Sequence, residues 1–470
     1  MSRGPLPPRP RTSPLAPLPR PPAPARLFPS RRAARGWWNG IGWAVSTLNV
    51  TTFKAPDAVA GGTLGIGPGV ADESNPAKGG YFTTVNVLAE LALPGEWYLN
   101  RTSGLLVIVP PPGGLAPGSG GLPPHEAAGP ATVSVLRSAV VRVEGASAVS
   151  LTGFRVAYGN GPGVQALGTE GFSFGSGVVE NVGMMAFNVS GGAGALIDGV
   201  EVGATGSGGV FLFGGDRDTL TAANHTVRSS RIHGFSRITQ AYAPGVYLEG
   251  VGNRAEAVEV FDSTHMCVYV QGNGHELAGS DVHHCAQMVR DSGAVYMGRD
   301  WSARGTVIRD TAFHDIDTHL GGPGGDVQAV YLDDSFSGVT VENCSFTNIS
   351  RAFLLGGGRD NRFTNNRVVN TTSKSPPVHF DDRDEGWAKA ACRPGGILYE
   401  LLARVPYNTS AVWRREYPLL AGILTDSPCL PKYNRIENNT FCGAGATFID
   451  QDAATIAKWG SFASGNTERC

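Results

Sequence analysis

A four-residue phrase recurs along the second half of this chain and constrains its fold more than any other feature. The copies read Val-Tyr-Leu-Glu, Val-Tyr-Val-Gln, Val-Tyr-Met-Gly, Val-Tyr-Leu-Asp, Phe-Leu-Leu-Gly and Val-His-Phe-Asp, and they begin at Val246, Val268, Val295, Val330, Phe353 and Val378. Successive copies start 22, 27, 35, 23 and 25 residues apart. Such a period, with longer gaps where loops are inserted, is typical of a solenoid. The solenoid would stack the fourth residues into one column, which contains Glu249, Gln271, Asp333 and Asp381.

A second phrase precedes the first in each coil. It has an apolar residue, four mostly polar or small residues and another apolar residue, as in Val341 to Phe346. Late in the chain its middle is rich in asparagine, at Asn343, Asn365–Asn366 and Asn438–Asn439. Stacked Asn side chains at a bend can hydrogen-bond from coil to coil. Two short strands per coil and a period of 22 to 27 residues predict a parallel β-helix, which is an all-β fold.

The repeats divide the chain into segments. We expect a disordered Pro/Arg-rich tail at 1–35, an N-terminal β region at 36–130, the parallel β-helix at 131–385, an insertion or cap at 386–433, and a last coil with a C-terminal tail at 434–470. Within the insertion, Gly396 to Val405 is expected to form a short helix and Trp413 to Leu420 an extended cap.

The composition of the chain indicates which binding partners and which cellular compartment to expect. The net charge of −2 predicts no nucleic-acid partner, and the absence of a run of about 18 apolar residues predicts no membrane span. Nine Asn-x-Ser/Thr sequons favour a glycoprotein of the secretory pathway or the extracellular space, although the N-terminus lacks the apolar core of an ordinary signal peptide. We expect a monomer that acts on a polysaccharide or oligosaccharide.

The seven cysteines form no CxxC pair, which argues against a zinc site. Cys267, Cys285 and Cys344 lie inside repeats and are expected to be packed thiols. A disulfide can form among Cys392, Cys429, Cys442 and Cys470 if the protein is secreted.

Acidic residues gather around the first phrase. Asp333 and Asp381 lie in its column, Asp291 and Asp300 flank one copy, and Asp334 follows another. Cleavage of a glycosidic bond uses two carboxyl groups, about 5–5.5 Å apart in retaining enzymes and about 6.5–9.5 Å apart in inverting ones. These five are therefore the candidate catalytic carboxyls. The structural alternative is that each is a turn residue or the partner of an arginine.

Other polar and aromatic residues complete the candidate site. His314 is a further catalytic candidate because a following carboxylate, Asp315, can orient it, and a structural histidine ladder is the alternative. Tyr296 and Tyr331 are expected to point inward, as ladder residues. The candidate substrate-binding residues are Arg299, Trp301, His283, Arg359, His379, Arg383 and Trp387. We predict no metal and no cofactor, with calcium as a weaker alternative, because oxygen ligands for calcium are present but occur at no regular loop spacing.

Several segments, in this order, resemble right-handed parallel β-helix repeat proteins of the pectin-lyase-like superfamily. They are Pro94-Gly-Glu-Trp-Tyr-Leu-Asn-Arg, Asp291-Ser-Gly-Ala-Val-Tyr, Gly298-Arg-Asp-Trp, Tyr331-Leu-Asp-Asp, Gly356-Gly-Gly-Arg-Asp-Asn and His379-Phe-Asp-Asp-Arg. The resemblance implies a right-handed solenoid, near glycoside hydrolases that include an α-L-fucosidase and a xylanase. Such relatives more often carry His-x-Asp-x-Arg-Gly in the last segment, whereas Asp384 follows Arg383 here.

Three functional hypotheses follow. The first is a glycoside hydrolase that uses Asp333 with Asp300 or Asp381. The second is a polysaccharide lyase, which needs a base and a group that neutralises a uronate, and for which Arg299 and Arg383 are available. The third is a glycoprotein that binds glycans without cleaving them, because a fold does not determine a function.

Overall fold

The computed structural model describes residues 35–39, 42–44, 46–54, 63–70, 81–109, 133–319, 327–373, 375–443 and 447–468. The expected tail at 1–35 lies outside these residues apart from Arg35. The chain forms two compact units, and the larger one contains Trp38–Ser46, Ala71–Phe82 and Gly129–Cys470. Among the described residues, no helix is long and apolar enough to cross a membrane.

The N-terminal region contains short β segments. Strands β1 (Arg35–Asn39), β2 (Ser46–Lys54), β3 (Thr63–Val70) and β4 (Tyr81–Val85) form a four-stranded sheet in the order β3-β2-β1-β4. A 3-10 turn, η1 (Leu88–Glu90), precedes an antiparallel hairpin of β5 (Trp97–Leu99) and β6 (Leu106–Ile108).

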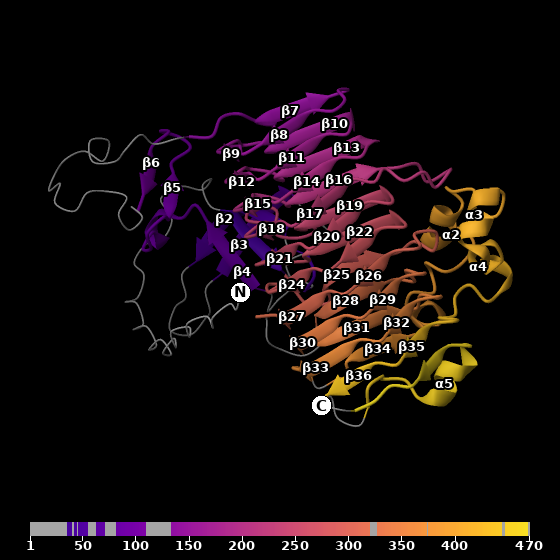
Figure 1. Cartoon of the computed structure of the whole chain (residues 1–470). Coiled ribbons are helices and arrows are strands. Elements are labelled where there is room, and N and C mark those ends of the chain that lie inside the picture. The colour runs from indigo at the N-terminus through magenta and orange to yellow at the C-terminus, as the bar shows by residue number, and fades with distance from the viewer. Residues whose placement is uncertain are drawn as a thin grey trace, which may run out of the picture. The chain divides into compact units, whose positions relative to one another are not determined.

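A parallel β-helix follows, built from three sheets that each coil extends by one strand (Figure 1). Sheet 1 contains β7 (Val141–Glu144), β10 (Val164–Glu170), β13 (Phe187–Ala193), β16 (Val210–Gly214), β19 (Val246–Val251), β22 (Val268–Asn273), β25 (Gly293–Gly298), β28 (Gln328–Asp333), β31 (Arg351–Gly356) and β34 (Val378–Asp381). Sheet 2 contains β8 (Ser150–Thr152), β11 (Ser173–Gly175), β14 (Leu196–Asp198), β17 (Thr226–Arg228), β20 (Arg254–Glu256), β23 (Glu276–Ala278), β26 (Val307–Arg309), β29 (Thr340–Glu342), β32 (Arg362–Thr364), β35 (Arg435–Glu437) and β37 (Phe462–Ser464). Sheet 3 contains β9 (Arg155–Ala157), β12 (Val178–Glu180), β15 (Glu201–Gly203), β18 (Arg231–His233), β21 (Glu259–Phe261), β24 (Asp281–His283), β27 (Ala312–Ile316), β30 (Ser345–Ile349), β33 (Arg367–Thr371) and β36 (Thr440–Cys442).

The register of sheet 1 confirms the predicted column. Glu249 pairs with Gln271, Gly298 pairs with Asp333, and Gly356 pairs with Asp381. Because neighbouring strands lie about 4.8 Å apart, Asp333 and Asp381 stand on backbones about 10 Å apart, with the Gly356 strand between them.

The tyrosine at the second position of the repeated phrase lies on the outer face of sheet 1, not on the inner face that we predicted. The first and third residues, such as Val246 and Leu248, are buried in the core, whereas Tyr247 is half-buried on the outer face. Tyr296 and Tyr331 occupy the same outward position, so the expectation that they point inward is wrong. Side chains alternate between the faces of a strand, and the fully apolar first and third residues take the inner face.

The core is held by ladders of like side chains. Phe313 stacks on Phe346 with ring centroids 4.9 Å apart. The predicted asparagine ladder is also present, because the buried amide of Asn366 donates to Asn439 at 3.1 Å and Asn439 donates to Asn466 at 3.0 Å. These bonds satisfy amide groups that would be costly to bury unpaired.

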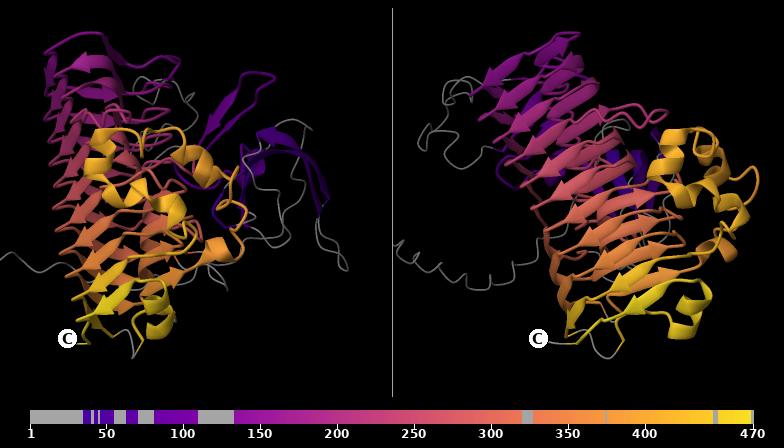
Figure 2. Two further views of the ribbon diagram at one scale, coloured as in Figure 1. Left: turned by 90° about the vertical axis from the view of Figure 1, so that its right-hand side faces the viewer. Right: turned by 45° about the vertical axis from the view of Figure 1, so that its right-hand side comes forward.

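The segment between β34 and β35 carries short helices, which lie alongside the solenoid (Figure 2). They are η2 (Arg383–Glu385), α2 (Ile397–Leu402), α3 (Ala411–Glu416), α4 (Pro418–Ala421) and η3 (Ile423–Thr425), and α5 (Ala453–Lys458) follows later. The expected extended cap at Trp413 to Leu420 is therefore wrong. Trp413 is buried on α3, and Pro418 occupies the start of α4, where a missing amide proton costs nothing.

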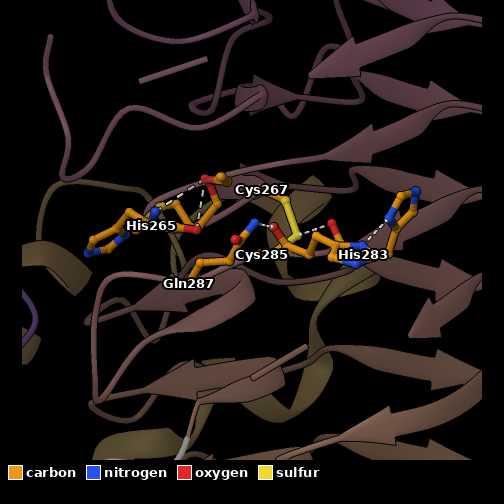
Figure 3. The surroundings of a disulfide bond; sticks show 8 residues. His265, Cys267, His283, Cys285 and Gln287 are labelled. Atoms are coloured by element: carbon orange, nitrogen blue, oxygen red, sulfur yellow. Dashed lines mark hydrogen bonds between the residues drawn. A yellow bond between two sulfur atoms is a disulfide. The ribbon is translucent and has the colours of Figure 1, made fainter. Parts of the chain in front are cut away.

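Among the described residues, the structure has two disulfides, of which Cys392–Cys429 lies within the group of cysteines where a disulfide was expected. Cys392–Cys429 closes the helical segment. Cys267–Cys285 lies inside the solenoid (Figure 3), so these two residues are not the free thiols that we expected. Cys344 is a buried thiol, as expected. Both cysteines lie in repeats, and the repeat pattern alone does not show that adjacent segments of one coil bring their sulfur atoms together.

Candidate functional site

A cavity of about 800 Å³ lies on the outer face of sheet 1, over β25, β28, β31 and β34. Many of the predicted site residues line this cavity. These are Asp291, Arg299, Asp333, Asp334, His379, Asp381, Arg383 and Trp387. These residues lie close together because the column formed by the repeated phrase places one outward side chain per coil on the same face of sheet 1.

The buried guanidinium of Arg383 occupies the centre of the site, between two carboxylates. Its Nη1 donates to Oδ1 of Asp333 at 2.5 Å and its Nη2 donates to Oδ2 of Asp381 at 2.9 Å. The space comes from Gly356 on the intervening strand, because a Cβ there would lie 2.4 Å from Cζ of Arg383. One arginine thus spans two coils and holds both carboxyl groups in the cavity.

Asp333 is a strong candidate proton donor. Burial and the nearby carboxylate of Asp334 raise the pKa of Asp333, against the lowering effects of Arg383 and of the Tyr296 hydroxyl. That hydroxyl donates to Oδ2 of Asp333 at 2.8 Å. A carboxyl group with a raised pKa retains a proton closer to neutral pH, which is what a general acid needs.

Asp381 behaves in the opposite way. Burial raises its pKa, but His379 and Arg383 outweigh this effect and lower the pKa to about 2. Nε2 of His379 lies 3.1 Å from Asp381, and its Nδ1 contacts the carboxylate of Asp450. Burial lowers the pKa of His379, but the hydrogen bonds to Asp381 and Asp450 outweigh it and raise the pKa to about 9. At neutral pH, Asp381 is therefore an anion beside an imidazolium.

Further hydrogen bonds hold the other acidic residues that surround Asp333 and Asp381. Nε of Arg299 donates to Asp334 at 2.6 Å, and the Tyr331 hydroxyl donates to Asp291 at 2.7 Å. Beneath the site, Asp384 accepts a hydrogen bond from Ser335. Burial and the carboxylate of Asp334 raise the pKa of Asp384 to about 8.

Two predicted binding residues are buried away from the cavity. Trp301 is 0% exposed and packs in the core of the helical segment, with Trp413 and Leu398. Arg359 is also buried, and its Nη2 donates to Asp426 at 2.5 Å. The prediction that Trp301 and Arg359 contact a ligand is wrong, because the insertion, which follows no repeat, covers both.

Asp300 lies outside the cavity as well. It lines a neighbouring hollow of about 530 Å³ on sheet 1, where Oδ2 is 3.3 Å from Nη2 of Arg217. Its other oxygen accepts from the backbone amide of Ser302 at 2.8 Å. These contacts assign Asp300 a structural role in the turn after β25, not a place beside Asp333.

His283 and His314 lie on a different sheet from the cavity. They are Cα partners on β24 and β27 of sheet 3, with rings stacked 4.6 Å apart. In Figure 3, His283 lies on the opposite side of the Cys267–Cys285 disulfide from His265, which lines the cavity. The expected roles of His314 in catalysis and of His283 in substrate binding are wrong for this cavity, because their strands face elsewhere.

The cavity also contains residues that sequence reasoning missed. Tyr296 and Tyr331 were assigned to the core, although the alternation of the phrase placed them beside the acids. Burial lowers the pKa of His265 to about 4, and its Nε2 lies 2.9 Å from the carbonyl oxygen of Trp43. Asp450 reaches His379 from the last coil, and no repeat or spacing signals that contact.

Comparisons with known proteins bear on the fold. The sequence model of the family described as right handed beta helix region matches residues 244–375. The solenoid is a right-handed parallel β-helix. A comparison with curated proteins finds no match. The expected nearness to particular glycoside hydrolases stays a prediction.

One solved structure similar to this β-helix chain is that of the Dettilon tailspike protein gp208, at 12% identity and a TM-score of 0.32. The similarity covers 69% of this chain and 60% of the tailspike chain, so the chain spans less than two thirds of that protein's length. So remote a likeness carries no argument about activity.

Proposed function

We propose that this β-helix is a glycoside hydrolase that cleaves a cell-wall or extracellular polysaccharide in the cavity on sheet 1. One observation carries the proposal. Two carboxyl groups in the same cavity, Asp333 and Asp381, have pKa values displaced in opposite directions. An acid whose pKa is raised and a carboxylate that stays ionised are the two groups that glycoside hydrolysis requires.

The chemistry assigns a role to each residue. Asp333 donates its proton to the glycosidic oxygen as the bond from that oxygen to the sugar carbon breaks. Asp381 stabilises the positive charge that develops on the sugar ring, either directly or by directing a water molecule. Water supplies the new hydroxyl group, and its other proton restores Asp333. Arg383 and His379 hold the Asp381 carboxylate in place and keep it ionised.

The surroundings of the cavity suit a polymeric substrate. Trp387 is 75% exposed at its rim, and an exposed indole offers a flat apolar face to a sugar ring. The hollow beside Asp300 shares Arg299 with the cavity and is lined by Tyr247 and Tyr269. A chain of sugars could extend from the cavity along the same face of sheet 1.

A polysaccharide lyase is supported less well, because a lyase needs a group that accepts a proton. Burial raises the pKa of the Tyr296 and Tyr331 hydroxyls, and His379 is protonated at neutral pH. His265 is neutral, but its side chain is buried and its Nε2 faces the Trp43 carbonyl. The tyrosines and His379 are thus protonated, His265 faces a backbone carbonyl, and the ionised Asp381 is held by His379 and Arg383, so each is a poor base for a lyase.

A glycan screen tests the proposal. Pectic, xylan, fucosylated and uronate-rich glycans are incubated with the full chain, and reducing ends and ultraviolet absorbance are followed. We expect new reducing ends without ultraviolet absorbance, and a loss of at least about 100-fold in Asp333→Asn. Asp198→Asn, on the outer face of sheet 2, is the matched control and should keep activity. An unsaturated uronate product would identify a lyase instead, and binding without cleavage would identify a glycan-binding protein.

We also propose that the chain passes through the secretory pathway. The support is the nine sequons together with the disulfides Cys267–Cys285 and Cys392–Cys429, since such bonds persist in oxidising compartments. Asn343 and Asn408 are exposed and able to accept a glycan. Enzymatic deglycosylation of the protein from its native source should lower its mass, and an unchanged mass would contradict the proposal.

A further inference from the structure

Three potential metal ligands converge on the outer face of sheet 3, which is separate from the cavity. Asp281 and His283 are alternate residues of β24, so their side chains leave the same face of the strand. His314 on the neighbouring strand β27 is the Cα partner of His283. One ligand atom from each of these residues lies within 4.8 Å of the other two.

The contacts around His314 are those of a preorganised ligand. Its Nδ1 lies 2.8 Å from Oδ2 of Asp315, which orients the ring and leaves Nε2 directed toward Asp281. Metal-bound histidines usually donate their other ring nitrogen to a carboxylate in this way. Asp315 is itself held by the Asn348 amide at 2.5 Å.

Asp281 supplies the carboxylate of the cluster. Its Oδ1 is buried and lies 2.9 Å from Nε2 of His314. Among the described residues, this oxygen nevertheless has no partner with hydrogen-bond geometry. A carboxylate oxygen that lies beside an imidazole nitrogen, on a side chain that is 46% exposed, is a ligand that a cation from solvent can reach.

We propose that Asp281, His283 and His314 bind one divalent transition-metal ion of the zinc class. Two imidazoles and a carboxylate suit zinc, nickel or copper better than calcium or magnesium, which prefer oxygen ligands. All three residues are partly exposed, so solvent can complete the coordination. The metal would join two successive coils outside the cavity, and this site does not depend on the proposed hydrolase activity.

The histidine ladder offers a control within the same column. His233 stands earlier in that column, where its ring stacks on Phe261 and its Nε2 is 2.6 Å from Glu201. Among the described residues, no third metal-binding group joins this pair. If stacking were the only role of these histidines, His233 and His314 would respond alike to metal.

The test is a titration of the untagged, chelator-treated full chain with Zn²⁺ by calorimetry, with the visible spectrum of bound Co²⁺ as a second readout. We expect one tight site, a fall of at least tenfold in affinity in His314→Ala and in Asp281→Asn, and unchanged affinity in His233→Ala. Circular dichroism of each metal-free variant shows that it is folded. Absence of a tight site, or equal affinity in His314→Ala and the unmodified chain, would overturn the proposal.

Discussion

The guanidinium of Arg383 lies over Gly356 and occupies the space in which any other residue would place its Cβ. This relationship links the repeated phrase to the chemistry of the cavity. Gly356 is the one member of the column between Asp333 and Asp381, and its missing side chain lets one arginine contact the carboxylates on both sides.

Gly356→Ala should therefore disturb the site more than a usual surface substitution. The new methyl group must displace Arg383, which breaks its bonds to Asp333 and Asp381. We expect activity to fall at least tenfold and the free energy of unfolding to fall by about 1–3 kcal/mol, as in overpacked sites. Denaturant unfolding and activity assays measure both effects. Gly422→Ala is the control, because only Thr425 comes within 4 Å of that position; equal effects would contradict the assigned role of Gly356.

Arg383→Met should destabilise the fold strongly. Removal of the guanidinium leaves the ionised Asp381 without its buried cation and Asp333 without the hydrogen bond from Arg383. Breaking a buried ion pair from one side costs about 3–5 kcal/mol. Urea unfolding at pH 7 measures the loss. Arg142→Met, which removes an exposed pair with Glu144 on the same sheet, should change stability by less than about 1 kcal/mol.

The His379 imidazolium predicts a loss of stability in mild alkali. Its pKa is raised from 6.5 to about 9 in the folded chain. The stabilisation is therefore complete below about pH 6.5 and is lost as the pH rises through 9, and it amounts to about 3 kcal/mol. Unfolding at pH 6 and pH 9.5 measures the difference, which His379→Gln should reduce by about 3 kcal/mol, with the remainder coming from Asp384. A pH dependence that persists unchanged in His379→Gln would assign it to another group.

Asp384 predicts a gain of stability on substitution. Its pKa is raised from 3.8 to about 8, so the folded chain prefers the protonated acid. The contribution is most favourable below pH 3.8 and is lost as the pH rises through 8. Asp384→Asn removes this penalty and leaves an amide oxygen that can still accept from Ser335. We expect thermal unfolding at pH 8 to show a gain of up to about 5 kcal/mol over the unmodified chain, and little gain at pH 4.

Substitution of Trp387 should change KM, whereas substitution of Trp301 should change stability. Trp387→Ala removes an exposed indole at the cavity rim, so we expect a higher KM on a polymeric substrate with little change in stability. Trp301→Ala empties a buried site in the helical segment and should cost about 3–5 kcal/mol of unfolding free energy. Paired measurements of KM and unfolding separate the two roles. A large stability loss in Trp387→Ala would contradict its assignment to substrate binding.

The corrections share a physical cause. Period-two alternation placed Tyr296 and Val295 on opposite faces, but it did not say which face was inner, and an aromatic ring suits either. The stacking of His283 on His314 was predictable from the repeat, whereas the face they occupy depended on which of three sheets carried them. Trp301 was predicted to bind substrate because nothing in its own segment of the sequence shows that the insertion packs over it.

The sequence by itself determined the parallel β-helix, the column that holds Asp333 and Asp381, and the asparagine ladder. These features follow from the pleat of a strand and the length of a coil, which are local and repeat along the chain. Only the tertiary structure decided that Arg383 bridges the two acids, that His379 meets Asp450, and that Asp281 meets His314. Such contacts join side chains from different coils or from segments that follow no repeat, and their geometry depends on packing that no spacing encodes.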